Sequence, residues 1–247
     1  MSAATASQRS VMPYAVLGLI ALAIVWALIA TGLWTDILRY RKDIVYLSKQ
    51  HLVLVGISGG LAIVAGVGIG IWLSRPWMTR YAEGTIQAVN MATSIPTLGK
   101  LALMMTFLGI GALPAIVGLW VATLLPIIRN TYAGIRAVPP HLIDAAQGMG
   151  MGPGEILRRV EVPNALFVIF AGVRTAMAVN VGTAPIAFLI GGGGLGELIF
   201  TGIDLQEYGM MLAGAIPTAL LAVAVDFVFG QAQYWLVPRG VNPQRNS

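Results

Sequence analysis

The sequence predicts an all-α, polytopic membrane bundle of about six transmembrane helices. Of its 247 residues, 57% are hydrophobic and only 10% are charged, and the mean hydropathy is +0.81. Soluble domains carry about 25% charged residues, so this chain cannot cover itself with a solvated surface. Its apolar runs are long and lack the alternation of apolar and polar residues that is typical of strands in a membrane β-barrel. Helices also satisfy the backbone hydrogen bonds of each span within that span.

Six apolar runs are long enough to cross the hydrocarbon core, which takes about 20 helical residues. The first run exceeds a signal-peptide core and no small-residue cleavage site follows Trp34, so we expect a retained anchor. Residues 36–50 place Ile37, Tyr40 and Ile44 on one helical face, which predicts an amphipathic helix at the outer interface. The expected spans cover residues 13–34, 51–74, 84–107, 113–134, 164–190 and 209–236.

The spans divide the chain into three parts. Residues 1–50 hold the anchor and the interfacial segment, residues 51–236 form the helical core, and residues 237–247 form a tail. Lys and Arg residues concentrate on the side that carries the loop around Asp144. This asymmetry predicts that the loop and both termini are cytoplasmic. Because the basic residues are scattered at span ends, the net charge of +5 does not indicate nucleic-acid binding.

The composition disfavours an enzyme. The chain has no Cys and two distant His residues, so it lacks a cysteine nucleophile, a thiolate metal site and a paired-His metal motif. Gly191, Gly193 and Gly196 match a dinucleotide-binding fingerprint, but they follow a membrane span rather than a strand. Lys100 follows a Gly without the Ser or Thr of a phosphate-binding loop. We expect no catalytic residue, no metal and no bound cofactor in this chain.

A long polar segment lies between the fourth and fifth runs. Pro139 and Pro140 end the preceding helix, because proline cannot continue it. We expect a short helix over residues 141–147, a turn at the following glycines, and a second short helix over residues 155–160 that ends before Pro163. A mere long loop is the alternative. The candidate site residues here are His141, Asp144, Ala145, Ala146, Gly148, Gly150 and Pro163.

A second motif, Ser94-Ile95-Pro96-Thr97-Leu98, falls within the third run. Proline removes a hydrogen bond from a membrane helix, so we expect a kinked helix whose polar side chains line a pathway. A kink used only for packing is the alternative. Lys100 shares a helix face with Pro96 and would line the same pathway, unless it reaches the interface or pairs with a partner's acidic residue. The candidate pathway residues are Asn90, Ser94, Pro96, Thr97, Lys100, Asn180 and Thr183.

Two further ionisable residues, Arg174 and Asp226, fall within the fifth and sixth runs. Charged groups inside a membrane mark a pathway or pair with one another. The sequence leaves both roles open.

The polar segment resembles the EAA loop of ABC importer permeases, with Asp144 at the usual Glu position. Four segments also resemble, in order, the permeases of osmoprotectant importers for glycine betaine, carnitine and choline. This resemblance runs through roughly residues 51–235. It rests on residues 125–135, 148–151, 172–184 and 190–200.

The resemblance implies a type I (MetI-like) permease core in a bacterial inner membrane. It implies a second permease subunit, identical or paralogous, two ATP-binding cassette subunits that bind ATP and Mg, and an extracytoplasmic solute-binding protein. The loop around Asp144 would couple to the ATPase. Lys100 departs from the apolar residue usual in these permeases, and in the pathway its positive charge would disfavour cationic substrates. Alternatives are a permease of this family for an amino acid or sulfonate, or an autonomous secondary transporter.

Overall fold

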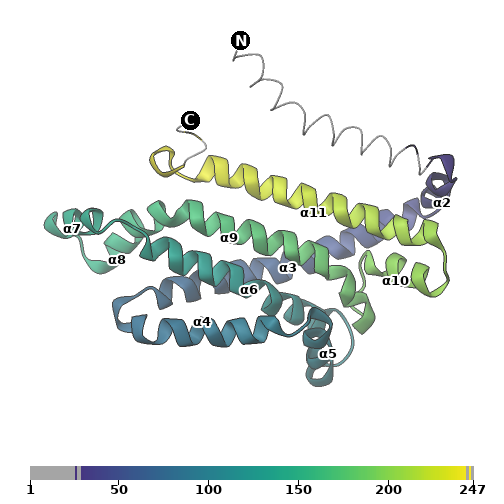
Figure 1. The fold of residues 1–247 in the computed structure, drawn as a ribbon, viewed down its shortest axis with the longest axis horizontal. Helices are drawn as coiled ribbons and strands as arrows, with labels where there is room; N and C mark the ends of the chain where they lie inside the picture. Colours follow the sequence, from purple (N-terminus) through teal and green to yellow (C-terminus); the bar gives the residue numbers. More distant parts are fainter. Residues whose placement is uncertain (1–25, 27–28, 243–244, 246–247) are drawn as a thin grey trace, which may run out of the picture.

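The computed structural model describes residues 26, 29–242 and 245, and these residues form helices joined by short turns. Four helices are long and apolar enough to cross a membrane, and a bent helix pair makes a fifth candidate span. The first expected span, residues 13–34, lies largely outside the described residues. The long helices lie side by side, with α7 and α8 at one end and α2 and α10 at the other (Figure 1). We call these the loop end and the opposite end.

The elements follow one another along the chain with few residues between them. They are α2 (Leu33–Arg39), α3 (Arg41–Leu73), the 3-10 turn η1 (Pro76–Met78), α4 (Thr79–Ser94), α5 (Thr97–Leu108), α6 (Ala112–Arg136), α7 (Pro140–Gly148), α8 (Pro153–Ile156), the π segment η2 (Leu157–Glu161), α9 (Val162–Thr183), the 3-10 helix η3 (Ala184–Ile190), α10 (Gly196–Asp204), α11 (Tyr208–Leu236) and η4 (Arg239–Val241).

Helix α6 packs between α3 and α9 at the centre of the bundle, and its buried residues Ala115, Leu119 and Ile127 belong to the main core cluster. Close approach of α3 depends on glycine, because a side chain at Gly66 would meet Ile127 and one at Gly70 would meet Thr131. A third glycine of α3, Gly59, packs closely against Met177 on α9 in the same way. The core is therefore a three-helix seam of small and branched residues.

The segment 36–50 does not form the separate interfacial helix that its amphipathic pattern predicts. The chain breaks at Tyr40, and residues 41–50 are the first turns of the continuous helix α3. Neither Gly nor Pro occurs between Arg41 and Val55, so nothing in the sequence ends the helix there.

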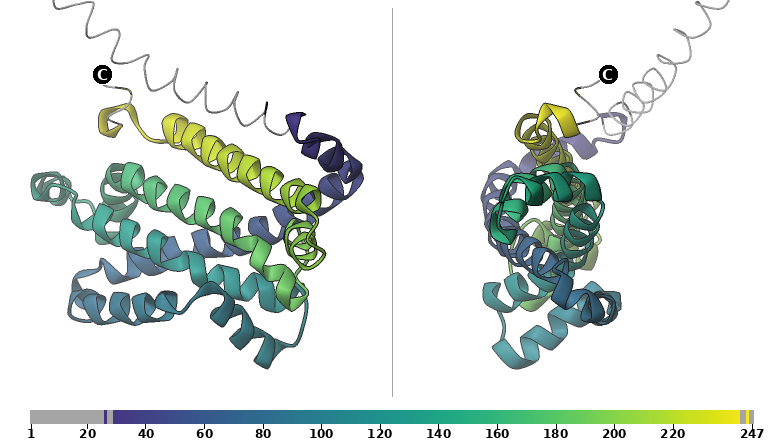
Figure 2. Two further views of the ribbon diagram at one scale, coloured as in Figure 1. Left: turned by 45° about the vertical axis from the view of Figure 1, so that its right-hand side comes forward. Right: turned by 90° about the vertical axis from the view of Figure 1, so that its left-hand side faces the viewer.

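The third expected span is broken rather than kinked. Its two halves, α4 and α5, meet at an angle of 92°. Ile95 and Pro96 are both extended, with ψ of 129° and 142°. For Ile95 the reason is that the residue before a proline avoids the helical region. In Figure 2, α5 turns away from the line of α4 at this point.

A run of glycines returns the chain into the bundle at the opposite end. Gly191, Gly193 and Gly194 have positive φ, and the main-chain N–H of Gly194 donates to the side chain of Gln50 at 3.1 Å. The turn delivers Leu195 and Leu198 into a second buried cluster. A compact re-entry thus closes this end of the bundle.

Candidate functional site

The first half of the polar loop is a short helix ended by glycine. Pro139 precedes α7 and Pro140 opens it, which suits a residue without an N–H group. At its end the N–H of Gly150 donates to Gln147 O at 2.8 Å and that of Met151 to Ala146 O at 3.1 Å. With Gly150 at φ +80°, this is a Schellman cap. The structure confirms the expected helix and the backbone geometry that favours glycine at position 150.

One face of α7 is open and the other is packed. Ala146 is buried, and α7 contacts α8 and the π segment. His141, Asp144 and Ala145 are exposed, and the large side chain of Met149 is exposed beside them. The loop therefore presents a small, low-relief surface with one carboxylate at its centre.

The second half of the loop differs from the sequence prediction. No short helix ends before Pro163; instead α8, the π segment and α9 follow without a break, and Pro163 is the second residue of α9. A proline ring clashes with the carbonyl four residues earlier in an α-helix. The π segment occupies the turn just before Pro163, where wider spacing accommodates the ring.

A salt bridge fixes this half of the loop to the turn that follows α3. Arg75 Nη2 lies 2.7 Å from Glu161 Oε2, and the two side chains are only 18% and 14% exposed. The guanidinium also donates to Ile71 O at 3.2 Å and to Ser74 Oγ at 2.9 Å. Sequence reasoning missed this pair, since its partners lie in different elements.

We expect Glu161→Gln to destabilise the loop end by about 1.5–3 kcal/mol, the usual loss for a hydrogen bond to a charged group. The measurement is the melting temperature of the purified protein. The control is Glu155→Gln, which removes an exposed pair with Arg159 at 3.2 Å and should change little. Equal melting temperatures for the two variants would contradict the anchoring role of Glu161.

The break at Pro96 is capped by Lys100. Its Nζ donates to Thr93 O at 3.2 Å, and the residue is only 6% exposed. A cation at a helix C-terminus bonds the carbonyls that have lost their helical partners. Lys100 therefore stabilises the broken helix and does not stand on an open surface of the protomer, which differs from the pathway position expected for it.

The other candidate residues of this motif are distributed around the break. Ser94 and Pro96 are exposed, whereas Asn90 and Thr97 are half-buried. Ser94 Oγ donates to Asn90 O at 2.8 Å, so the hydroxyl is satisfied within α4. The pathway role of these four residues remains a prediction.

For Lys100→Met we expect a lower melting temperature and an unchanged ratio of choline to glycine betaine transport. The substitution keeps an unbranched side chain but leaves Thr93 O without its donor. A neighbouring control is Thr106→Val, which removes a hydroxyl bonded only within α5 on an exposed face. A changed transport ratio in Lys100→Met would restore the pathway role.

Asn180 and Thr183 do not join the Pro96 motif. Asn180 is fully buried and donates to Ser58 Oγ at 2.9 Å, which links α9 to α3. Next to it, Nε2 of the buried His51 lies 3.1 Å from Val181 O. Thr183 Oγ1 donates to Val179 O at 2.8 Å. Asn180 thus holds two core helices together, which differs from the lining position expected for it.

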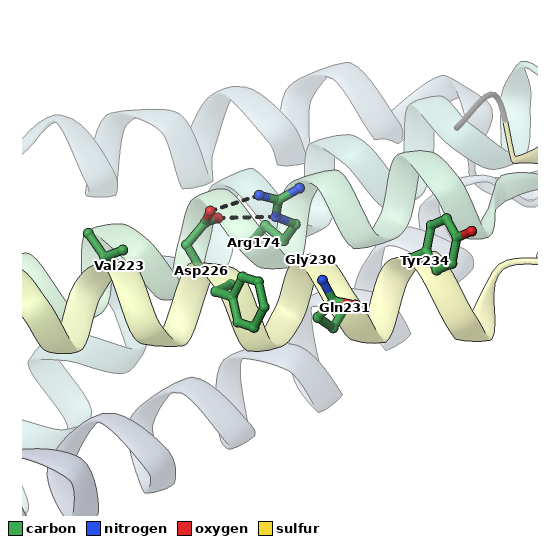
Figure 3. A pocket seen from close by; sticks show the side chains of 7 residues that line it. Arg174, Val223, Asp226, Gly230, Gln231 and Tyr234 are labelled. Atoms are coloured by element: carbon green, nitrogen blue, oxygen red, sulfur yellow. Dashed lines mark hydrogen bonds and ion pairs between the residues drawn. The ribbon is translucent and has the colours of Figure 1, made fainter. Parts of the chain in front are cut away.

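Arg174 and Asp226 form a bidentate pair between α9 and α11 (Figure 3). Nε donates to Oδ1 at 3.1 Å and Nη2 to Oδ2 at 2.7 Å. Nη1 donates to Gln233 Oε1 at 3.3 Å, and Gln233 Nε2 in turn donates to Phe167 O at 3.0 Å. Gly230 leaves room for the guanidinium, since a side chain there would meet Arg174 Cζ at 3.3 Å. Of the two roles left open by the sequence, pairing is confirmed.

This fold and loop match a known class of protein. Residues 61–240 match the family model for the binding-protein-dependent transport system inner membrane component. The chain belongs to this family and is a multi-pass membrane component of a transport system.

The relatives are permease proteins of similar length. The chain is 47% identical to the osmoprotectant import permease protein OsmY of Salmonella typhimurium, over 84% of this chain and 88% of that one. It is 39% identical to the choline transport system permease protein OpuBB of Bacillus subtilis, over 81% and 91% of the two chains. It is also 39% identical to the carnitine transport permease protein OpuCB of Listeria monocytogenes, over 79% and 89%.

Solved structures confirm the fold. An inward-facing structure of the MetNI methionine ABC transporter aligns with a TM-score of 0.68 and 25% identity, over 81% of this chain and 96% of that chain. An amino acid ABC transporter aligns with a TM-score of 0.61 and 18% identity, over 81% and 94%, which supports the fold alone.

Proposed function

We propose that this chain is the permease subunit of an ATP-driven importer that carries a compatible solute of the betaine type. The observation that carries the proposal is the capped loop of α7, with its exposed Asp144 and its glycine turn, on the membrane core of this family. The relatives' names, which refer to osmoprotectants, choline and carnitine, support the substrate class.

The open face of α7 is the surface on which a separate ATPase would bind. Its small side chains allow a close approach, and Asp144 offers a carboxylate to a basic or N–H-rich pocket. Movement of the ATPase would reach the membrane helices through the continuous segment of α8, η2 and α9. In this role the chain performs no chemistry, and ATP and Mg are bound by the partner.

The assembly we propose contains two permease subunits, two ATP-binding cassette subunits and an extracytoplasmic solute-binding protein. The loop end and both termini face the cytoplasm, and the opposite end faces the binding protein. The proposed assembly includes membrane lipid but no nucleic acid.

Co-purification tests the coupling surface. We expect the ATPase subunit to elute with the wild-type chain in detergent, and Asp144→Lys to weaken this association because the substitution reverses the central charge of the surface. The control is Asp204→Lys, which reverses a charge at the opposite end. Retention of the ATPase by Asp144→Lys to the same extent as by Asp204→Lys would contradict the assignment.

Uptake tests the substrate class. Cells that lack this gene should lose uptake of glycine betaine, carnitine or choline, measured with radiolabelled solute at raised osmotic strength, and should regain it from a plasmid copy. Unchanged uptake of all three solutes, together with lost uptake of an unrelated amino acid or sulfonate, would show that the substrate class is wrong.

A further inference from the structure

The Arg174–Asp226 pair lies well inside two candidate membrane-crossing helices. Arg174 comes twelve residues after Val162, the first residue of α9, which is about 18 Å along a helix. Asp226 comes ten residues before Leu236, the last residue of α11, which is about 15 Å. Half of a hydrocarbon core is also about 15 Å. Each charge therefore lies about half the thickness of a hydrocarbon core from the loop-end residue named for its helix.

The pair is not enclosed by its own protomer. The side chains of Arg174 and Asp226 are 31% and 43% exposed. Open hollows flank them, one of about 460 Å³ on the α11 side and one of about 520 Å³ on the α9 side. Charged groups at this depth face a protein interior or a water-filled cavity rather than lipid. The surface around the pair is therefore turned toward water or another subunit.

The α9 side of this surface combines small residues with two larger apolar ones. Its hollow is lined by Ala171, Thr175 and Ala178, by the apolar Phe167 and Val179, and by the ion pair and Gln233. The small residues leave room for a solute beside the ion pair, and the two charges suit a water-filled pathway better than a lipid contact.

The hydrogen-bond donors of Arg174 are only partly engaged within the protomer. Arginine has five N–H donors, and the described contacts of Arg174 occupy three of them. Gln233, held by Phe167 O, fixes the guanidinium from the side away from Asp226. The site thus presents a positive and a negative group, side by side and with no net charge, to the hollow.

We propose that this hollow is a transit site for a zwitterion, whose carboxylate binds Arg174 while its ammonium group lies against Asp226. A zwitterion matches both charges at once, whereas a simple cation meets Arg174 and a simple anion meets Asp226 with the wrong sign. This proposal rests on the proposed function for its solute class, and it assigns the discrimination expected of Lys100 to a different pair of residues.

Cysteine accessibility tests the position of the site, since the chain contains no native Cys. In the assembled, nucleotide-free complex in liposomes, we expect Thr175→Cys to react with a charged methanethiosulfonate reagent and glycine betaine to slow the reaction. The control is Val64→Cys, an exposed α3 position about 14 Å from the loop end of its helix, which should stay unreactive in lipid. An unreactive Thr175→Cys, or one that glycine betaine does not protect, would overturn the proposal.

Transport selectivity tests the chemistry. The double variant Arg174→Gln with Asp226→Asn removes both charges and leaves a neutral amide at each position. With one binding protein that delivers both solutes, we expect the ratio of glycine betaine to choline uptake to fall about tenfold, the effect of one lost charge-assisted contact.

A merely structural pair gives a different result. If Arg174 and Asp226 only clamp α9 to α11, the double variant lowers both rates by the same factor, and the ratio stays at the wild-type value. That outcome overturns the proposal. Wild-type protein that imports neither solute would instead contradict the proposed function, so the two failures are distinguishable.

Discussion

Replacing Gly150 by Val is expected to abolish uptake while leaving an inserted, abundant protein. Gly150 has φ +80° in the cap of α7, and a left-handed conformation costs an L-residue about 1–2 kcal/mol and a β-branched one more. The cap must rearrange, which displaces Asp144 and Met149 from the exposed surface. We expect ATPase association to weaken by at least about tenfold. The measurements are co-purified ATPase and uptake of the radiolabelled solute.

Gly152 provides the matched control. Both glycines belong to the same loop, and a side chain at either would meet no atom within 4 Å. They differ in backbone conformation, because Gly152 is extended at φ −74° and ψ 162°, where valine is at ease. Near-normal uptake in Gly152→Val would show that the backbone conformation at position 150, and not the size of the added side chain, causes the loss. Equal loss in both variants would refute the importance of the left-handed cap.

Replacing Gly196 by Ala is expected to prevent correct folding of the opposite end. A methyl group at this position would overlap the carbonyl of Pro185, which belongs to the backbone and cannot move as a side chain can. The helix α10 would have to shift and withdraw Leu195 and Leu198 from their cluster. Overpacking of this kind costs about 1–3 kcal/mol or more. The measurements are the yield in detergent and the melting temperature.

Gly182→Ala is the control for Gly196→Ala. Gly182 lies in α9 with open space around it, and alanine is the better helix former. We expect the control to match or exceed the wild-type melting temperature. A Gly196→Ala protein that melts at the wild-type temperature would show that the contact with Pro185 does not constrain the fold.

Local sequence signals predicted the elements that depend on one or two residues. The apolar runs predicted the four long helices of the described residues, and the Pro and Gly residues predicted α7 and its turn at Gly150. The signal at Pro163 was ambiguous, since a proline that ends one helix can equally open the next. In the structure, the π segment before Pro163 allows the helix to continue through the proline. No residue pattern in the sequence predicts a π segment.

Features that depend on distant contacts could not be predicted. A proline alone does not determine whether a membrane helix bends or breaks. Here Lys100 reaches Thr93 and stabilises the broken form. Likewise, Arg75 and Glu161, or Arg174 and Asp226, are paired by the packing of helices that lie far apart in the sequence. Asn180 was expected in the pathway from its polarity, but its partner Ser58 on α3 keeps it in the core.

The two sides of the polar loop are attached to the membrane helices with unequal stiffness. On the α6 side, residues 137–139 are turn or irregular backbone, and residues 149–152 likewise separate α7 from α8. On the other, α8 runs through the π segment into α9, and residues 153–190 qualify as one membrane-crossing rod. We therefore expect movement of the loop to reach α9 more directly than α6. The salt bridge from Arg75 holds Glu161, the last residue of the π segment, within this continuous helical segment.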